Sequence, residues 1–87
     1  MSYRIEFRPA ALRAMRRVPK PFKTRLLAAM AALADSPRPP GSVRLQGPDG
    51  LHRVRVGDYR IVYLIEDRVL LICAVRVAHR KDAYRGL

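Results

Sequence analysis

The second half of the chain alternates strand-like runs with very short connectors. Each run is rich in Val, Ile, Leu and Tyr, and only two residues separate it from the next. Connectors this short favour hairpins, and Gly-Asp is good turn chemistry. The stretch predicts antiparallel strands, and residues 70–78, apolar except for Arg76, predict a central one. The expected strands are Leu51–Val56, Tyr59–Glu66 and residues 69–77, and their connectors are Gly57-Asp58 and Asp67-Arg68.

The first third of the chain combines one strand with helical periodicity. Residues 3–8 alternate polar and apolar positions and predict a half-buried strand that ends at Pro9. Apolar residues then recur at spacings of three and four, in one helix that stops before Pro19 and a second that starts at Pro21. Only a few residues separate the helices, so we expect an antiparallel helical hairpin. The apolar stripe of the second helix is Phe22, Leu26, Met30 and Leu33.

These elements together predict the fold class. A proline-rich loop over residues 35–41 is expected to follow the helices, and residues 43–45 are expected to form a further short strand. The order β-α-α-β-β-β, with this extra strand, predicts an α+β fold in which the two-helix hairpin packs on a mostly antiparallel, twisted sheet. A length of 87 residues allows one domain, which we expect to span residues 1–87.

The charge of the chain restricts its partners. Lys and Arg number 18 against 7 Asp and Glu, which gives a formal net charge of +11 and favours a polyanionic partner. One cysteine and two histidines, with no carboxylates arranged around them, predict no metal site, and we expect no cofactor. No apolar run is long enough to span a membrane, and the N-terminus lacks a signal peptide pattern. We therefore expect a cytoplasmic protein with no membrane partner.

Three arginines are the first candidates for a binding site. Arg53 and Arg55 are two residues apart on one expected strand, so their side chains leave the same face. Arg60 lies just beyond the Gly57-Asp58 turn and comes close to Arg55 if the register allows. Three cations on one face favour a bound anion, and guanidinium groups suit phosphate. The alternative is an ordinary solvated face that keeps a basic protein soluble.

The tail and the first helix supply the remaining candidates. The tail could bind nucleic acid or could be a short helix that packs Tyr84 on the sheet. The basic helix face is either a solvated surface or a groove for an acidic partner segment. Cys73 and His52 are expected to be structural. The tail candidates are His79, Arg80, Lys81, Tyr84 and Arg85, and the helix candidates are Arg13, Arg16 and Arg17.

Taken together, these residues resemble the RelE/ParE family of toxins from toxin–antitoxin modules. The resemblance covers essentially the whole chain and is carried by SPRPPGSVRL (residues 36–45), GLHRVRVGDYRIVYLIED (residues 50–67) and VAHRKDAYRGL (residues 77–87). It implies a ribosome-dependent mRNA endonuclease, in which the 2′-hydroxyl attacks the adjacent phosphate without a metal. It also implies an antitoxin with an acidic, amphipathic C-terminal segment, in a toxin–antitoxin hetero-oligomer.

The resemblance also implies roles for individual residues. Arg60 and Arg80 would stabilise the pentavalent phosphate, with Tyr84 and Arg55 completing the catalytic set. Some active members carry lysines where this chain has Arg53 and Arg55, and arginine does not give up its proton. The general base is then Tyr84 or His79, or is dispensable. The alternative function is a ParE-like poison of DNA gyrase without nuclease activity. RNA contacts would come from Arg53, Lys81, Arg85 and His79, and antitoxin contacts from Arg13, Arg16 and Arg17.

Overall fold

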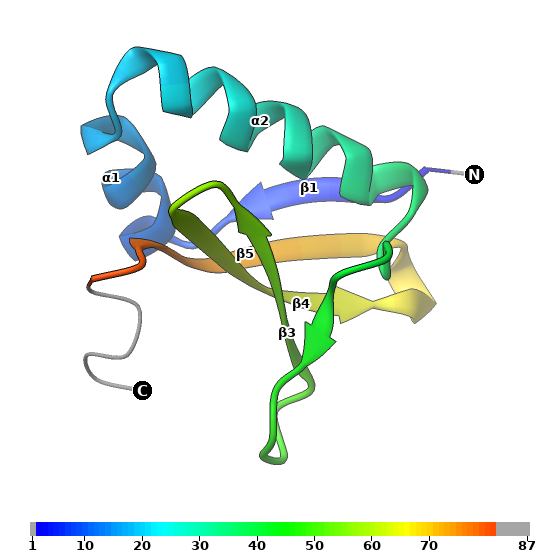
Figure 1. The fold of residues 1–87 in the computed structure, drawn as a ribbon. Coiled ribbons are helices and arrows are strands. Elements are labelled where there is room, and N and C mark those ends of the chain that lie inside the picture. Colours follow the sequence, from blue (N-terminus) through cyan, green and yellow to red (C-terminus); the bar gives the residue numbers. More distant parts are fainter. Residues whose placement is uncertain (1, 82–87) are drawn as a thin grey trace.

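A computed structural model describes residues 2–81 and shows two helices on a five-stranded sheet (Figure 1). The expected α+β class is confirmed, and so are the bounds of the expected strands Leu51–Val56 and Tyr59–Glu66. In chain order the elements are β1 (Arg4–Phe7), α1 (Pro9–Arg17), α2 (Lys20–Asp35), β2 (Val43–Arg44), β3 (Leu51–Val56), β4 (Tyr59–Glu66), the 3₁₀ turn η1 (Asp67–Val69) and β5 (Leu71–His79).

The sheet has the strand order β1-β5-β4-β3-β2. The pairs β2–β3, β3–β4 and β4–β5 are antiparallel, as expected from the short connectors, whereas β1 pairs parallel to β5. The parallel pair requires a long crossover, and this crossover contains both helices. The N-terminal strand therefore lies next to the last strand, and β5 lies inside the sheet between β1 and β4 (Figure 1).

Each helix has a proline in its first turn and buries a narrow apolar stripe, and α2 begins at Lys20, one residue before the expected Pro21. Pro9 occupies the first turn of α1, where its missing N–H costs nothing, and Val18 and Pro19 separate α1 from α2. Leu26, Met30 and Leu33 of α2 are almost completely buried, which stabilises the fold by roughly 1.5–3 kcal/mol for each side chain. Phe22 departs from the predicted stripe, because it is 44% exposed and its ring lies 5.8 Å from that of Tyr59.

The core lies between the helices and one face of β4 and β5. The buried residues of this face alternate along β4, whereas in β5 the register shift at Val62/Tyr63 places Ala74 and Val77 three residues apart. They are Ile61, Tyr63, Ile72, Ala74 and Val77. Residues of α1 and α2, above all Ala11, Met15 and Leu26, complete the core. The other face of the sheet carries the residues between these positions.

The connection from β4 to β5 differs from the sequence prediction. The Asp67-Arg68 pair does not form a two-residue hairpin, because residues 67–69 make a 3₁₀ turn and Leu70 adopts a left-handed conformation with φ of 51°. This longer connection delays the start of β5, which runs from Leu71 to His79 instead of over residues 69–77. His79 is consequently the last residue of a strand and not part of the tail.

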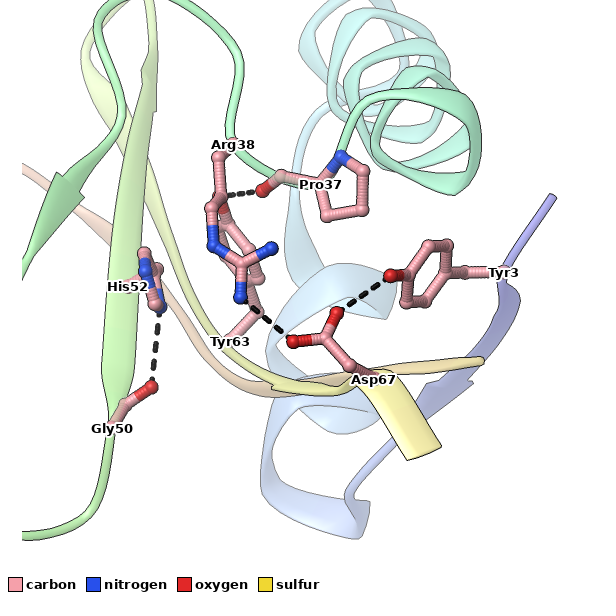
Figure 2. Close-up of polar contacts among 7 residues, drawn as sticks. All are labelled: Tyr3, Pro37, Arg38, Gly50, His52, Tyr63 and Asp67. Atoms are coloured by element: carbon pink, nitrogen blue, oxygen red, sulfur yellow. Dashed lines mark hydrogen bonds and ion pairs between the residues drawn. The ribbon is translucent and has the colours of Figure 1, made fainter. Parts of the chain in front are cut away.

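At the end of β4, a cluster of polar side chains joins the N-terminal segment, the proline-rich loop and the β4–β5 connection by hydrogen bonds (Figure 2). The Asp67 carboxylate accepts a 2.6 Å hydrogen bond from Tyr3 Oη and a 3.0 Å ion pair from Arg38. The hydroxyl of Tyr63 donates to the carbonyl of Pro37 at 2.8 Å. These contacts hold the N-terminal segment and the proline-rich loop against the β4–β5 connection, far along the chain from the arginines of β3.

The same contacts shift the acid–base properties of this cluster. The hydrogen bonds from Tyr3 and Arg38 lower the pKa of the Asp67 carboxyl. The Asp67 carboxylate raises the pKa of the Tyr3 phenol, since ionisation would remove the donated proton. Burial raises the pKa of Tyr63. Asp67 is thus stabilised as a carboxylate and both phenols as neutral groups.

Among residues 2–81, neither helix has the length and apolar composition needed to cross a bilayer.

Candidate functional site

The arginines of β3 and β4 lie together on the sheet face opposite the core. Arg55 is the direct cross-strand partner of Arg60, which confirms the expected proximity of these two residues. Arg53 precedes Arg55 by two positions and therefore projects from the same face, next to Val62. Val54 and Val56, which alternate with the arginines, pack against the core. The face opposite the helices is therefore basic.

The register adds a fourth arginine that we did not predict as a site residue. Arg76 of β5 is the cross-strand partner of Val62, which Arg53 flanks on the other side. Two rows result: Arg53–Val62–Arg76, and Arg55–Arg60–Ala78 one step along the strands. Residues 70–78 are apolar except for Arg76. A single charged residue in a central strand was the sequence feature that could have identified Arg76 as a site residue.

One atom of this arginine face lacks a partner. Arg53 Nε is buried and has no hydrogen-bond partner within the described residues. A buried guanidinium N–H without an acceptor is costly, by roughly 1–3 kcal/mol or more for a charged group. An oxygen of a bound anion would remove this cost, and the planar fork of arginine matches phosphate geometry. The site chemistry therefore favours a phosphate-containing ligand.

A cavity of about 650 Å³ extends from this face toward α1. Leu51 and Val62 line its sheet side, and Ala10, Ala14 and Arg17 line its helix side. The lining also includes Tyr59, Arg76 and His79. The cavity exists because β1 pairs only with the first half of β5, from Leu71 to Ala74, and α1 packs beside the rest.

The imidazole of His79 is held in one tautomer. Its Nδ1 accepts a 3.2 Å hydrogen bond from the backbone N–H of Lys81, so the proton of the neutral ring is on Nε2. The ring also meets Tyr59 edge-on, with the centroids 5.2 Å apart. In this arrangement His79 offers a donor and not a free acceptor. Of the two candidate bases, the geometry therefore disfavours His79.

The tail begins beside the β3–β4 turn. The backbone N–H of Arg80 donates a 2.6 Å hydrogen bond to the carbonyl of Asp58, two residues before Arg60. This contact places the backbone of Arg80 at the same end of the sheet as Arg55 and Arg60. The side chains of Arg80 and Lys81 are exposed. Tyr84 and Arg85 lie outside the described residues.

The three arginines of α1 do not share one environment. Arg13, Arg16 and Arg17 are all exposed, but only Arg17 lines the cavity, one turn beyond Ala14 on the same helix face. Arg13 and Arg16 are not among the lining residues. The basic helix face expected from the sequence is therefore divided between the cavity and the outer surface.

The remaining chemical groups have structural surroundings. His52 stacks on Tyr63 at 5.8 Å, and its Nδ1 lies 3.2 Å from the Gly50 carbonyl (Figure 2). Cys73 is a free thiol within β5. Across residues 2–81, no three His, Cys, Asp or Glu side chains gather closely enough to hold a metal ion.

Comparison with known proteins gives consistent matches over nearly the whole chain. A family model described as the ParE toxin of the type II toxin–antitoxin system parDE matches residues 5–84. Toxin RelE of Mycobacterium tuberculosis is 29% identical over 84 residues, which cover 95% of this chain and 87% of that protein.

Solved structures support the fold. The archaeal RelE–RelB complex from Pyrococcus horikoshii OT3 contains a chain that matches with a TM-score of 0.82 and 27% identity, over 95% of this chain and 100% of that one. The RelBE2 toxin–antitoxin complex of Mycobacterium tuberculosis matches with a TM-score of 0.81 and 24% identity, over 92% of this chain and 100% of that one. The two helices and mostly antiparallel sheet are thus an established architecture.

Proposed function

Because this chain belongs to the ParE/RelE family of type II toxins, we propose that it is a ribosome-dependent mRNA endonuclease. In the proposed reaction, the 2′-hydroxyl of a nucleotide in the ribosomal A site attacks its own 3′-phosphate. The P–O5′ bond then breaks, which leaves a 2′,3′-cyclic phosphate on one fragment and a 5′-hydroxyl on the other. The observation that carries this proposal is the arginine face with the buried, unpartnered Nε of Arg53.

The arginines match the charge changes of this reaction. Negative charge increases on the phosphate as the 2′-oxygen attacks, and fixed cations stabilise that charge without reorganisation. Arg60, with Arg80 anchored at the same end of the sheet, takes this role. Arg53 satisfies its Nε on a phosphate oxygen, and Arg55 opposite Arg60 adds a second guanidinium.

The proton transfers need groups other than the arginines. Arginine stays protonated, and His79 Nδ1 already accepts from Lys81, so neither takes the proton of the 2′-hydroxyl. His79 Nε2–H instead binds a phosphate oxygen or a base. Tyr84 is the candidate base that remains, and Lys81 and Arg85 add contacts to the RNA backbone.

The partner of the toxin in the cell follows from the family and the charge. Both solved structures compared above are complexes of a RelE toxin with its antitoxin. We propose a cognate antitoxin with an acidic, amphipathic segment in a hetero-oligomeric complex in the cytoplasm. Arg13 and Arg16, exposed on α1 outside the cavity, are the proposed contacts on the helical side.

Poisoning of DNA gyrase is the second candidate function. The matching family model is that of ParE toxins, and the strand pair carries Arg53 and Arg55 where some nucleases of the family carry lysine. A non-nucleolytic binder needs no general base, which this chain lacks among the residues of its arginine face. In that case the basic face would bind the gyrase–DNA complex.

In vitro translation followed by primer extension distinguishes the two functions. The purified, antitoxin-free protein is expected to cut mRNA only when ribosomes are present. Arg60→Ala should abolish the cuts, whereas Arg68→Ala, which removes an exposed arginine of η1, should leave them unchanged. Absence of cuts together with inhibition of DNA supercoiling by the same preparation would replace the nuclease with the gyrase poison.

A further inference from the structure

The cavity between α1 and β5 is lined by residues other than the arginines that bind the reacting phosphate in the proposed mechanism. The arginine pair Arg55 and Arg60 lies near the β3–β4 turn, whereas Arg17 and Arg76 line the cavity from α1 and β5. No role in the proposed reaction uses Arg17 or Arg76. We propose that these two arginines bind the phosphate backbone of the RNA next to the cleaved bond, so that a single strand of RNA runs from the arginine face into the cavity.

The register fixes how Arg76 relates to the arginine face. Arg53 and Arg76 flank Val62 on neighbouring strands, so their Cα atoms are about 10 Å apart, twice the spacing between strands. Both side chains point away from the core. Arg76 therefore continues the row of Arg53 toward α1, and the positive face is continuous from β3 to the cavity.

The helix side of the cavity leaves room for a ligand. Ala10, Ala14 and Arg17 follow one another at spacings of four and three, so they share one face of α1. The side chains of Ala10 and Ala14 are small and leave space in the cavity, and Arg17 adds a positive charge on the same side of α1. A volume of about 650 Å³ lies within the range of about 300–1,000 Å³ that is common for small-ligand sites.

The lining matches RNA better than an acidic peptide. The lining includes the apolar side chains of Leu51, Val62 and Val75, against which a base or ribose can pack, and the neighbouring rings of Tyr59 and His79, on which a base can stack. Arg17 and Arg76, which also line the cavity, supply positive charges for the backbone phosphates. Continuity with the arginine face means that the same RNA strand reaches both sites.

Salt-dependent binding of a single-stranded RNA oligonucleotide tests this inference, which rests on the proposed function. The oligonucleotide carries 2′-deoxyribose throughout the expected cleavage region, so that binding is measured without cutting. Each lost phosphate contact lowers the slope of log affinity against log salt concentration by about 0.7. Arg17→Ala and Arg76→Ala should each show this decrease and bind at least several-fold more weakly, whereas Arg68→Ala should keep the wild-type slope.

A second pair of variants keeps the test valid if Arg76→Ala does not fold. Ala10→Glu puts a negative charge into the cavity at the first turn of α1, where acidic residues stabilise a helix. Ala31→Glu adds the same charge on an exposed position of α2. Ala10→Glu is expected to weaken RNA binding about tenfold relative to Ala31→Glu, with melting temperatures compared by circular dichroism.

The outcomes separate the two proposals. If Arg17→Ala and Ala10→Glu bind RNA like their controls, the cavity does not hold RNA and the inference is wrong. If those variants weaken only the binding of a synthetic acidic peptide, the cavity is a peptide site and the inference is likewise wrong. If the wild type does not cut mRNA on ribosomes but the slopes decrease as expected, the cavity assignment stands and the nuclease proposal fails.

Discussion

Arg55 and Arg60 face each other directly across the β3–β4 pair, on the sheet face away from the core. Like charges in this position repel, by roughly 0.2–1 kcal/mol for an exposed cross-strand pair. An apolar cross-strand pair at these two positions would instead stabilise the sheet. Two guanidinium groups in this position can bind one phosphate between them.

The first prediction concerns anion-dependent stability. Inorganic phosphate should raise the melting temperature of the wild type by more than an equal ionic strength of chloride does, because phosphate bridges the two guanidinium groups. Arg55→Ala should melt slightly higher than the wild type at low salt and gain less from phosphate. Differential scanning calorimetry measures both effects. An identical response of the two proteins to phosphate would remove Arg55 from the anion site.

The second prediction separates charge from geometry at Arg60. Arg60→Ala should reduce ribosome-dependent cleavage by roughly 10²–10³-fold, the usual cost of removing one donor to a developing oxyanion. Arg60→Lys keeps the charge but loses the paired N–H donors, and we expect it to recover only part of this loss. Single-turnover cleavage on programmed ribosomes gives the rates. Full recovery by lysine would reduce the role of Arg60 to a point charge.

The third prediction tests the assignment of His79 as a donor. His79→Gln retains an N–H group near the position of Nε2, so it should keep more RNA affinity than His79→Ala. Neither variant should change the shape of the dependence of the cleavage rate on pH, because another group takes the proton of the 2′-hydroxyl. Loss of a pH limb in both variants would make His79 the general base after all.

The fourth prediction follows from the pKa shifts of the cluster around Asp67. The folded state lowers the pKa of the Asp67 carboxyl below its usual value of about 3.9, so this carboxylate stabilises the fold above that pH. The contribution disappears as the pH falls through the lowered pKa. Tyr3 behaves in the opposite sense, since its pKa is raised and its contribution is lost only at alkaline pH.

Thermal melts between about pH 3 and pH 7 measure the acidic part of this dependence. Asp67→Asn should lower the melting temperature near neutral pH and flatten its decrease toward acid. Asp49→Asn, in the exposed loop before β3, provides the matched control and should keep the wild-type pH profile. Equal acid sensitivity of all three proteins would show that the Asp67 cluster does not couple stability to pH.

The fifth prediction concerns the turn that joins β3 and β4. Gly57 has φ of 60°, which other residues adopt at a cost, and a side chain there would meet only ordinary contacts with the Arg25 guanidinium at 3.6 Å. Gly57→Ala should therefore cost about 1 kcal/mol of unfolding free energy from backbone strain alone. Chemical denaturation measures it. A loss several times larger would mean that the turn positions more than its own two strands.

Local pattern was sufficient for most of the fold. The alternation in Leu51–Val56 and Tyr59–Glu66 and the short Gly57-Asp58 connector determine an antiparallel hairpin in which Arg55 must lie opposite Arg60. The parallel pairing of β1 with β5 has no local signal, since it depends on how two helices pack between them. The left-handed Leu70 was also beyond prediction, because leucine has no preference for that conformation.

The candidate site was predictable on the hairpin and less so elsewhere. Arg53 and Arg55 are two residues apart on one strand, and Arg60 follows just after the Gly57-Asp58 turn, so the sequence alone indicates that the three lie close together. Arg17 and Arg76 meet in one cavity although they are far apart in the chain, and only the tertiary arrangement brings α1 to the free half of β5. The tautomer of His79 depends on a single backbone hydrogen bond, which no sequence pattern specifies.

The pairing of β1 with β5 also sets the order of events during synthesis. β1 has no strand partner until β5 has been synthesised. β5 also contributes Arg76 and His79 to the cavity. A nascent chain that still lacks β5 has no strand to join β1 to β4, and its cavity lacks Arg76 and His79. If the protein acts on ribosomes, it therefore cannot act before β5 has been synthesised and paired with β1.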